Sequence, residues 1–230
     1  MKLHGFQKMT LLDYPGKVAC TVFTGGCNFR CPFCHNALLV TQLDEAEEYD
    51  EDEIIAFLKK RKGLLDGVAV TGGEPLMTQD TVEFIRRIKA EGYPVKLDTN
   101  GSYPDRLKFL VNEGLVDYVA MDIKNSPELY AETAGLPHFD ISKIEESVSF
   151  LLDGKVDYEF RTTVVRQFHT VESMTDAAKW IKGAKRYFLQ NFIDSGNLIG
   201  DGLCGVPKEE MELMCEAASH FVPDTFIRGI

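Results

Sequence analysis

The sequence has no excess of basic residues and no long apolar run. Its 25 Lys and Arg residues stand against 36 Asp and Glu residues, so the net charge is -11. We therefore do not expect broad binding to nucleic acid, because the phosphates would be repelled. Without a run of ~18 apolar residues we expect no transmembrane helix. Residues 1–6 lack the apolar core of a secretory signal, which predicts a cytoplasmic protein.

The sequence also has few cysteines outside one cluster. Three of its six cysteines lie within eight residues at C-x₃-C-x₂-C spacing: Cys27, Cys31 and Cys34. In a reducing compartment this clustering indicates metal ligands or redox groups instead of a disulfide framework. Cys20 lies in a predicted strand and Cys215 in a helical pattern, so we expect both in the core. Cys204 receives no predicted role.

Strand-like and helix-like segments alternate along the rest of the chain. The predicted strands cover residues 18–24, 67–71, 94–98, 116–123, 156–165, 186–193 and 226–227. The predicted helices cover residues 54–62, 81–90, 104–112, 142–152, 172–182 and 209–219. Ser142, with Glu145 three residues later, matches a capping box at the start of one helix.

Such alternation predicts βαβ units and a parallel sheet. We expect an α/β fold, a partial (β/α)6 TIM-like barrel forming a single domain; an open doubly wound sheet is the alternative. The expected parts are an N-terminal loop over residues 1–16, a barrel core over 17–200, and a C-terminal helix with a short strand over 201–230.

Polar and reactive residues follow the ends of four successive predicted strands. In folds of this kind, function gathers at the carboxyl ends of the strands. We therefore expect these groups to meet at one rim: the cysteines, Gly72-Gly73-Glu74, Asp98-Thr99-Asn100, and Asp122 with Lys124.

The cysteine loop admits four interpretations. Structural zinc could use His35 as a fourth ligand, although zinc sites usually combine two separated ligand pairs. Covalent haem would match the run Cys31 to His35 but suits an exported protein. The thiols could also be unligated or redox-active. We favour a 4Fe–4S cluster, because three thiolates would hold three irons and leave the fourth open.

The cysteine motif, with an aromatic residue before its last cysteine, resembles the signature of radical S-adenosylmethionine (SAM) enzymes. Further motifs resemble glycyl-radical-enzyme activating proteins, and most of all those that activate anaerobic ribonucleoside-triphosphate reductase. These motifs are Asp13-Tyr14-Pro15-Gly16, Gly26-Cys27-Asn28-Phe29-Arg30-Cys31, Cys34-His35-Asn36, Thr71-Gly72-Gly73-Glu74-Pro75, Asp98-Thr99-Asn100-Gly101 and Asp122-Ile123-Lys124. They cover a little over half of the chain.

The resemblance implies that Cys27, Cys31 and Cys34 hold the cluster and that its open iron binds SAM. Reductive cleavage of SAM would yield methionine and a 5′-deoxyadenosyl radical, which abstracts a Cα hydrogen from a glycine of the partner enzyme. By the same resemblance, Phe33 would lie by the adenine and Asn36 near the SAM-facing side.

Further ligand contacts follow from the resemblance. A carbonyl or carboxylate of Gly72, Gly73 and Glu74 would accept a hydrogen bond from the SAM ammonium, because glycines let the backbone approach closely. A monovalent cation near SAM would be held by the side chains of Asp98, Thr99 and Asp122 and the carbonyl of Ala120.

Two basic residues complete the predicted site. Lys124 would offer its charge to the SAM carboxylate or the substrate backbone, and Arg161, in an otherwise apolar strand, needs an anion or carbonyl partner. Related activating proteins often carry a His that contacts the SAM ribose after the sixth strand. This chain has none there, so Asn191 or Gln190 is expected to replace it.

The basic run at residues 59–62 is either a solvated helix end or a docking patch for an acidic flavodoxin or ferredoxin, the expected electron donors. The main functional hypothesis is an oxidoreductase that activates a glycyl radical enzyme. The alternatives are a radical SAM reaction on a small molecule, similar to that of 7-carboxy-7-deazaguanine synthase, and a non-catalytic metal-stabilised module.

Overall fold

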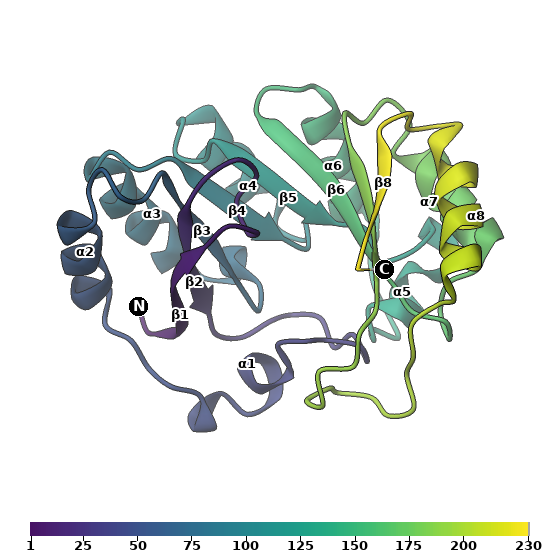
Figure 1. Cartoon of the computed structure of the whole chain (residues 1–230), viewed down its shortest axis with the longest axis horizontal. Helices are drawn as coiled ribbons and strands as arrows, with labels where there is room; N and C mark the ends of the chain where they lie inside the picture. The colour runs from purple at the N-terminus through teal and green to yellow at the C-terminus, as the bar shows by residue number, and fades with distance from the viewer. Residues whose placement is uncertain (230) are drawn as a thin grey trace. The chain divides into compact units, whose positions relative to one another are not determined.

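A computed structural model of the chain describes residues 1–229 and alternates strands with helices (Figure 1). Its strands are β1 (Leu3–Thr10), β2 (Ala19–Thr24), β3 (Gly67–Gly72), β4 (Val95–Thr99), β5 (Tyr118–Asp122), β6 (Asp157–Val164), β7 (Tyr187–Asn191) and β8 (Thr225–Arg228). Its α-helices are α1 (Ala37–Thr41), α2 (Glu51–Lys60), α3 (Asp80–Ala90), α4 (Pro104–Asn112), α5 (Tyr130–Thr133), α6 (Ser142–Leu152), α7 (Val171–Trp180) and α8 (Lys208–Ser219). Short 3₁₀ turns cover Leu43–Glu45, Pro75–Met77 and Pro127–Leu129.

The strands follow one another in chain order, from β1 to β8. β1 is antiparallel to β2, whereas the β2–β3, β3–β4, β6–β7 and β7–β8 pairs are parallel. A doubly wound sheet reverses its strand order at a switch point, whereas a barrel does not. The observed order therefore has the connectivity of the predicted partial barrel and confirms the α/β fold class.

The N-terminal segment differs from the prediction. Residues 3–10 were expected in a loop but form β1, which pairs with β2 from Leu3 opposite Thr24 to Thr10 opposite Ala19. Only the two end residues of β1 are buried. The strand therefore lacks the apolar alternation that would reveal it in the sequence.

The predicted capping box is also wrong. Ser142 is the first residue of α6, and its backbone N–H donates to Asp140 Oδ1 at 3.0 Å. A capping box occurs instead at α7, where Thr170 and Ser173 exchange side-chain and backbone hydrogen bonds, each of 3.1 Å. Ser173, the third residue of α7, takes the place of the Glu or Gln that the usual capping box carries.

The chain forms two compact units. Unit 1 comprises residues 1–28, 38–120 and 155–157, and unit 2 comprises 29–37, 121–154 and 158–230. The predicted boundary at residue 200 is not tested by this division and stays a prediction.

Amphipathic helices supply the core of unit 1. In α2 the buried side chains are Ile54, Ile55 and Leu58. In α3 they include Phe84, Ile85 and Ile88, and all three are fully buried. Their spacing of three and four residues places each set on one helix face, as the sequence predicts.

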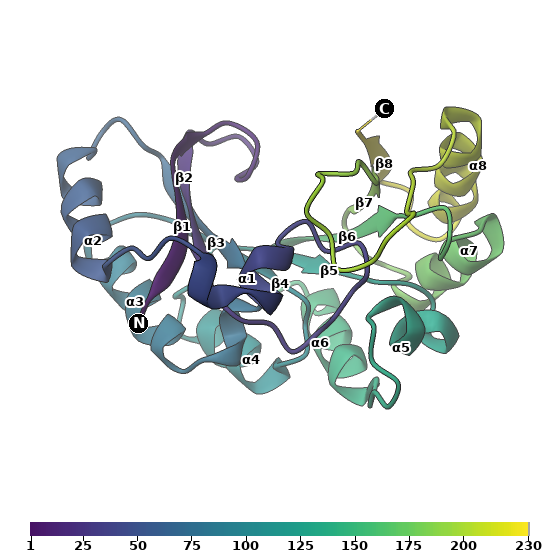
Figure 2. The same cartoon turned by 90° about the horizontal axis from the view of Figure 1, so that it is seen from below.

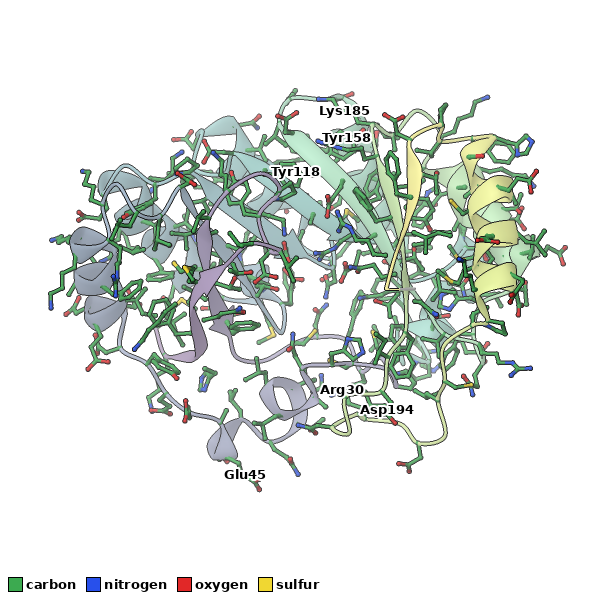
Figure 3. The ribbon with its side chains drawn as sticks, in the orientation of Figure 1. Arg30, Glu45, Tyr118, Tyr158, Lys185 and Asp194 are labelled. Atoms are coloured by element: carbon green, nitrogen blue, oxygen red, sulfur yellow. The ribbon has the colours of Figure 1, made fainter. Side chains whose placement is uncertain are left out.

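In unit 2, α7 and α8 lie side by side in both views (Figures 1 and 2). They bury Met174 and Ala177 from α7 and Met211 and Met214 from α8. At the start of β6, the Tyr158 hydroxyl accepts a hydrogen bond from the backbone N–H of Lys185 at 3.3 Å, and Figure 3 shows these residues together. Within residues 1–229, none of the helices combines the length and apolarity needed to cross a bilayer.

Candidate active site

In unit 1, the turn after β3 packs directly on the turn after β2. Gly73 N donates to Thr24 O at 3.0 Å, and Glu74 N donates to Gly26 O at 2.8 Å. A Cβ on Gly73 would lie 1.9 Å from Gly26 O, and one on Gly72, whose φ is +122°, would lie 2.3 Å from Thr24 O. Both glycines are therefore required by backbone packing, not only by ligand approach as the sequence suggested.

The Glu74 carboxylate is a buried hydrogen-bond acceptor that joins two strand ends. Its side chain accepts from Leu76 N at 2.9 Å, Thr99 Oγ1 at 2.8 Å and Asn100 N at 2.7 Å. Glu74 is only 1% exposed. The carboxylate thus ties the turn after β3 to the end of β4. Two acceptors were predicted for the SAM ammonium, a backbone carbonyl of this turn and the Glu74 carboxylate. Because the carboxylate already accepts these three hydrogen bonds, the carbonyl is the better candidate.

Three side chains that were not predicted as site residues form a hydrogen-bond network that reaches Cys27 through Asn100. Asn100 Nδ2 donates to Asn28 Oδ1 at 3.0 Å and lies 3.8 Å from Cys27 Sγ. Asn28 Nδ2 donates to Ser102 Oγ at 2.9 Å. Hydrogen bonds to cluster sulfurs tune iron–sulfur centres. Both asparagines stood inside recognised motifs, but only the fold reveals that they share a network.

Three of the four groups predicted to hold a monovalent cation lie in unit 1, and the side chains of two of them have other partners. In unit 1, Asp98 is ion-paired with the buried Lys96, and the Thr99 hydroxyl donates to Glu74. Ala120 lies buried in β5. Across residues 1–229, no group of three or more His, Cys, Asp and Glu side chains is gathered as for a single metal ion. The cation therefore stays a prediction.

In unit 2, Cys31 and Cys34 lie on one tight turn, with Cys34 N donating to Cys31 O at 3.1 Å. Burial raises the pKa of the Cys31 thiol to about 11, against the opposing effect of the Lys124 charge. Burial also raises the pKa of Cys34, and a hydrogen bond from the Asn36 backbone N–H opposes this rise. Buried thiols of this kind ionise when a cationic metal centre binds them.

The segment after β7 fastens this cysteine turn. Gly200 N donates to Pro32 O at 2.8 Å. The His35 ring stacks on Phe192 with 5.4 Å between ring centroids, and His35 Nε2 lies 2.9 Å from Ile193 O. These contacts attach His35, which one interpretation of the sequence made a zinc ligand, to the segment after β7. The same segment includes Asp194, which Figure 3 labels.

Three charged side chains meet after β5 and on β6. Lys124 Nζ lies 3.0 Å from Asp122 Oδ2, while Arg161 Nε and Nη2 lie 3.1 and 3.0 Å from Asp122 Oδ1. Burial alone would raise the pKa of Asp122, but Lys124 and Arg161 lower it to about 2. Asp122 is therefore an anionic partner of the kind that the sequence led us to expect for Arg161. The same carboxylate orients the Lys124 side chain.

Phe33 and Asn191, two further predicted SAM contacts, also lie in unit 2. The Phe33 ring packs against His169, with 6.4 Å between centroids and an interplanar angle of 72°. Asn191 Nδ2 donates to Val206 O at 3.0 Å, and its Oδ1 accepts from Val206 N at 2.9 Å. The Asn191 amide therefore holds the chain before α8, so a ribose contact would have to share these groups.

The basic run at residues 59–62 lies in unit 1 and covers the last two residues of α2 and the two residues after them. Lys59 pairs with Glu91 at 3.5 Å, and Arg61 lies over the Phe57 ring. The run lies before the first residue of β3, whereas Gly72 is the last residue of that strand. A six-residue strand is about 20 Å long, so this patch is a strand length away from the turn that packs on Cys27.

The chain is similar to characterised families along most of its length. The model of the Radical SAM superfamily matches residues 21–181. A provisionally named glycyl-radical enzyme activating enzyme of Methanocaldococcus jannaschii is 34% identical over 196 residues, covering 82% of this chain and 78% of the relative. The 7-carboxy-7-deazaguanine synthase of Koribacter versatilis is 29% identical over 164 residues, covering 70% and 67%.

Solved structures show the same fold. The crystal structure of Streptococcus suis SuiB bound to S-adenosylmethionine superposes with a TM-score of 0.69 at 12% identity, over 90% of this chain and 49% of that one. At this identity the likeness concerns the fold alone. The family match over residues 21–181 and the 34% identical relative go further. Together they show that the chain belongs to the radical SAM superfamily.

Proposed function

We propose that this protein is a radical SAM activase that installs a glycyl radical on a partner enzyme, with an anaerobic ribonucleoside-triphosphate reductase as the partner suggested by its motifs. The observation that carries the proposal is the position of Lys124. Asp122 orients its ammonium group, whose charge acts on the Cys31 thiol. A cation beside a cluster ligand suits the carboxylate of a bound SAM.

The spacing of Cys27, Cys31 and Cys34 fits a 4Fe–4S cluster, to which they would supply three thiolates while the fourth iron stays open for SAM. Cys31 and Cys34 share one tight turn, which suits ligands of a single cluster. A reduced cluster bound there would supply the electron for cleavage of SAM to methionine and a 5′-deoxyadenosyl radical, which would take a hydrogen atom from a glycine Cα to form 5′-deoxyadenosine and leave the glycyl radical on the partner. The superfamily supports this cofactor set.

The chain's own residues bind and orient. The Lys124 ammonium would hold the SAM carboxylate, with Asp122 keeping that side chain extended and Arg161 balancing the charge. The Phe33 ring would offer an apolar surface to the adenine. In unit 1, a carbonyl of the turn at Gly72 and Gly73 would receive the SAM ammonium, while Glu74 holds the turn in shape.

A flavodoxin or ferredoxin is the electron donor we propose. The basic run at residues 59–62 is a weak candidate for its docking patch, because it precedes β3 and lies away from the turn at Gly72. Reversing these four charges is expected to leave reduction by the donor and dithionite-driven SAM cleavage unchanged. If charge reversal slowed reduction by the protein donor but not dithionite-driven cleavage, the docking role of residues 59–62 would be supported after all.

The decisive experiment uses anaerobically reconstituted protein, dithionite, SAM and candidate glycyl radical enzymes, read by electron paramagnetic resonance. We expect a glycyl radical on the partner and stoichiometric 5′-deoxyadenosine. Cys31→Ala should give neither, and the matched control Cys204→Ala should give both. SAM cleavage without a radical on any partner would contradict the activase proposal.

A second candidate is a radical SAM reaction on a small molecule, favoured by the similarity to the Koribacter versatilis synthase. It predicts that a deazapurine precursor, not a partner protein, stimulates SAM consumption. The third hypothesis, a metal-stabilised module, predicts zinc and no labile sulfide. Iron, zinc and sulfide analysis of anaerobically purified protein separates it from both enzymes.

A further inference from the structure

The segment that carries Asp122 and Lys124 is held by its backbone carbonyls. Three successive carbonyls each accept a hydrogen bond from a side chain on another element of unit 2. The pairs are Tyr130 OH to Asp122 O at 3.3 Å, Thr162 Oγ1 to Ile123 O at 2.6 Å, and His169 Nε2 to Lys124 O at 2.8 Å. Buried backbone carbonyls need hydrogen-bond partners, and here side chains from three other parts of unit 2 supply them, so the path of the chain after β5 is tightly specified.

His169 differs from the other two donors because both ring nitrogens are engaged. It is 2% exposed, and its Nδ1 accepts from Val165 N at 3.0 Å. Nδ1 also lies 3.2 Å from Val165 O. Because Lys124 O can only accept, Nε2 carries a proton, and in the neutral ring Nδ1 is then the acceptor for Val165 N. Burial lowers the pKa of His169, which keeps the ring in this neutral form.

The next residue reinforces the same connection. Asn125 Nδ2 donates to Phe168 O and to Thr133 Oγ1, each at 2.9 Å, and Asn125 is fully buried. The 122–125 segment and the loop at 165–169 are thus joined at two consecutive positions. The His169 ring also meets the Phe33 ring edge-on, so a single side chain contacts two of the predicted SAM-binding residues.

We propose that His169 is a positioning residue that sets the placement of Lys124 and of the Phe33 ring, and thereby the affinity for SAM. The inference rests on the SAM contacts assigned to those two residues in the proposed function. His169 does not touch the ligand itself; it acts through the Lys124 carbonyl. Nothing in its sequence context, an isolated His after β6, indicated this task.

The two nitrogens of His169 can be tested separately with a matched pair of variants. His169→Gln places an amide N–H near the former Nε2 and keeps the donor to Lys124 O. His169→Asn places an amide oxygen near the former Nδ1 and keeps the acceptor for Val165 N. Both lose the aromatic ring, and each loses one of the two hydrogen bonds, so the direction of their difference reports which bond matters for SAM binding: weaker binding in His169→Asn points to the bond to Lys124 O.

We expect His169→Asn to weaken SAM binding by about tenfold, the effect of one lost hydrogen bond. His169→Gln should lie within about threefold of the wild type. In the cluster-free protein, hydrogen exchange over residues 122–126 should quicken in His169→Asn and not in His169→Gln. In a Lys124→Ala background, the difference in SAM affinity between the two variants should vanish.

Equal SAM affinities for His169→Asn and His169→Gln would overturn the inference, as would a difference that persists in the Lys124→Ala background. The proposed function fails separately. If no partner acquires a glycyl radical while the two variants still differ in SAM affinity, the activase assignment falls and the role of His169 stands.

Discussion

Glu74 after β3 and Asp122 at the end of β5 are both acidic side chains at strand ends, but their surroundings differ. Glu74 is buried and accepts hydrogen bonds from two backbone N–H groups and a hydroxyl. Asp122 is partly exposed and pairs with two cationic side chains, Lys124 and Arg161. The neutral donors around Glu74 hold the turn after β3 in one shape. The ion pairs of Asp122 instead leave the positive charges of Lys124 and Arg161 directed at the site.

The difference predicts which property each residue controls. A buried carboxylate with neutral donors leaves those donors unsatisfied when it is changed, so folding should suffer. A partly exposed ion pair is screened by water and contributes less to stability. We therefore expect Glu74 to matter first for the fold and Asp122 first for ligand binding.

The largest effect is expected from the predicted cluster ligands. Cys27→Ala and Cys31→Ala should each abolish the cluster and SAM cleavage, because three thiolates are needed. Iron content, visible absorbance and 5′-deoxyadenosine formation measure this. The exposed Cys204→Ala variant is the control, and loss of the cluster there would refute the ligand assignment.

Glu74→Gln should give the next largest effect. The amide NH₂ replaces one carboxylate oxygen, so a donor faces either Asn100 N or both Leu76 N and Thr99 Oγ1. The free energy of unfolding should therefore fall by about 2–3 kcal/mol. Urea unfolding of the cluster-free protein measures it. Glu83→Gln, on the exposed face of α3, should stay within about 0.5 kcal/mol of the wild type; an equal loss there would remove the contrast.

Asp122→Asn should lower the free energy of unfolding by a smaller amount, about 1–2 kcal/mol near neutral pH. Lys124 and Arg161 lower the pKa of Asp122 to about 2 in the fold, against about 3.9 in an unfolded chain. The stabilisation is therefore present above about pH 4 and is lost as the pH falls toward 2. Unfolding measured against pH should show the wild type and Asp122→Asn converging at acid pH.

The exposed Asp201→Asn variant provides the control for Asp122. Its difference from the wild type should be small at every pH. SAM affinity supplies the other half of the comparison: Asp122→Asn should weaken binding through Lys124, while Glu74→Gln should cost more in unfolding free energy. The reverse order of the two stabilities would show that the contrast between these carboxylates is mistaken.

The smallest effect concerns the neutral network near Cys27. Ser102→Ala removes the acceptor of the Asn28 amide, and we expect a loss of about 1 kcal/mol in the free energy of unfolding. Ser149→Ala, at an exposed position in α6, should cause no loss, because Ala favours helices. Thermal or urea unfolding distinguishes them; equal behaviour would mean that the amide network contributes nothing to stability.

Elements with a clear apolar period were predictable. The helix expected at residues 104–112 matches α4, and that at 142–152 matches α6. Both bury a regular stripe of side chains, which is written into local spacing. β1 was missed because its pairing partner is β2 and its own middle residues are half-buried or exposed, without apolar alternation. Strand pairing of that kind depends on residues elsewhere in the chain.

The sequence by itself determined the thiol spacing, the strand-end positions of the reactive residues and the fold class, because these depend on neighbours a few residues apart. Only the tertiary structure decided the partners of the site residues. Glu74 meets Asn100 across 26 positions, Arg161 meets Asp122 across 39, and His169 meets Lys124 across 45. Such contacts arise when strands align side by side, and no local pattern encodes which polar groups then face each other.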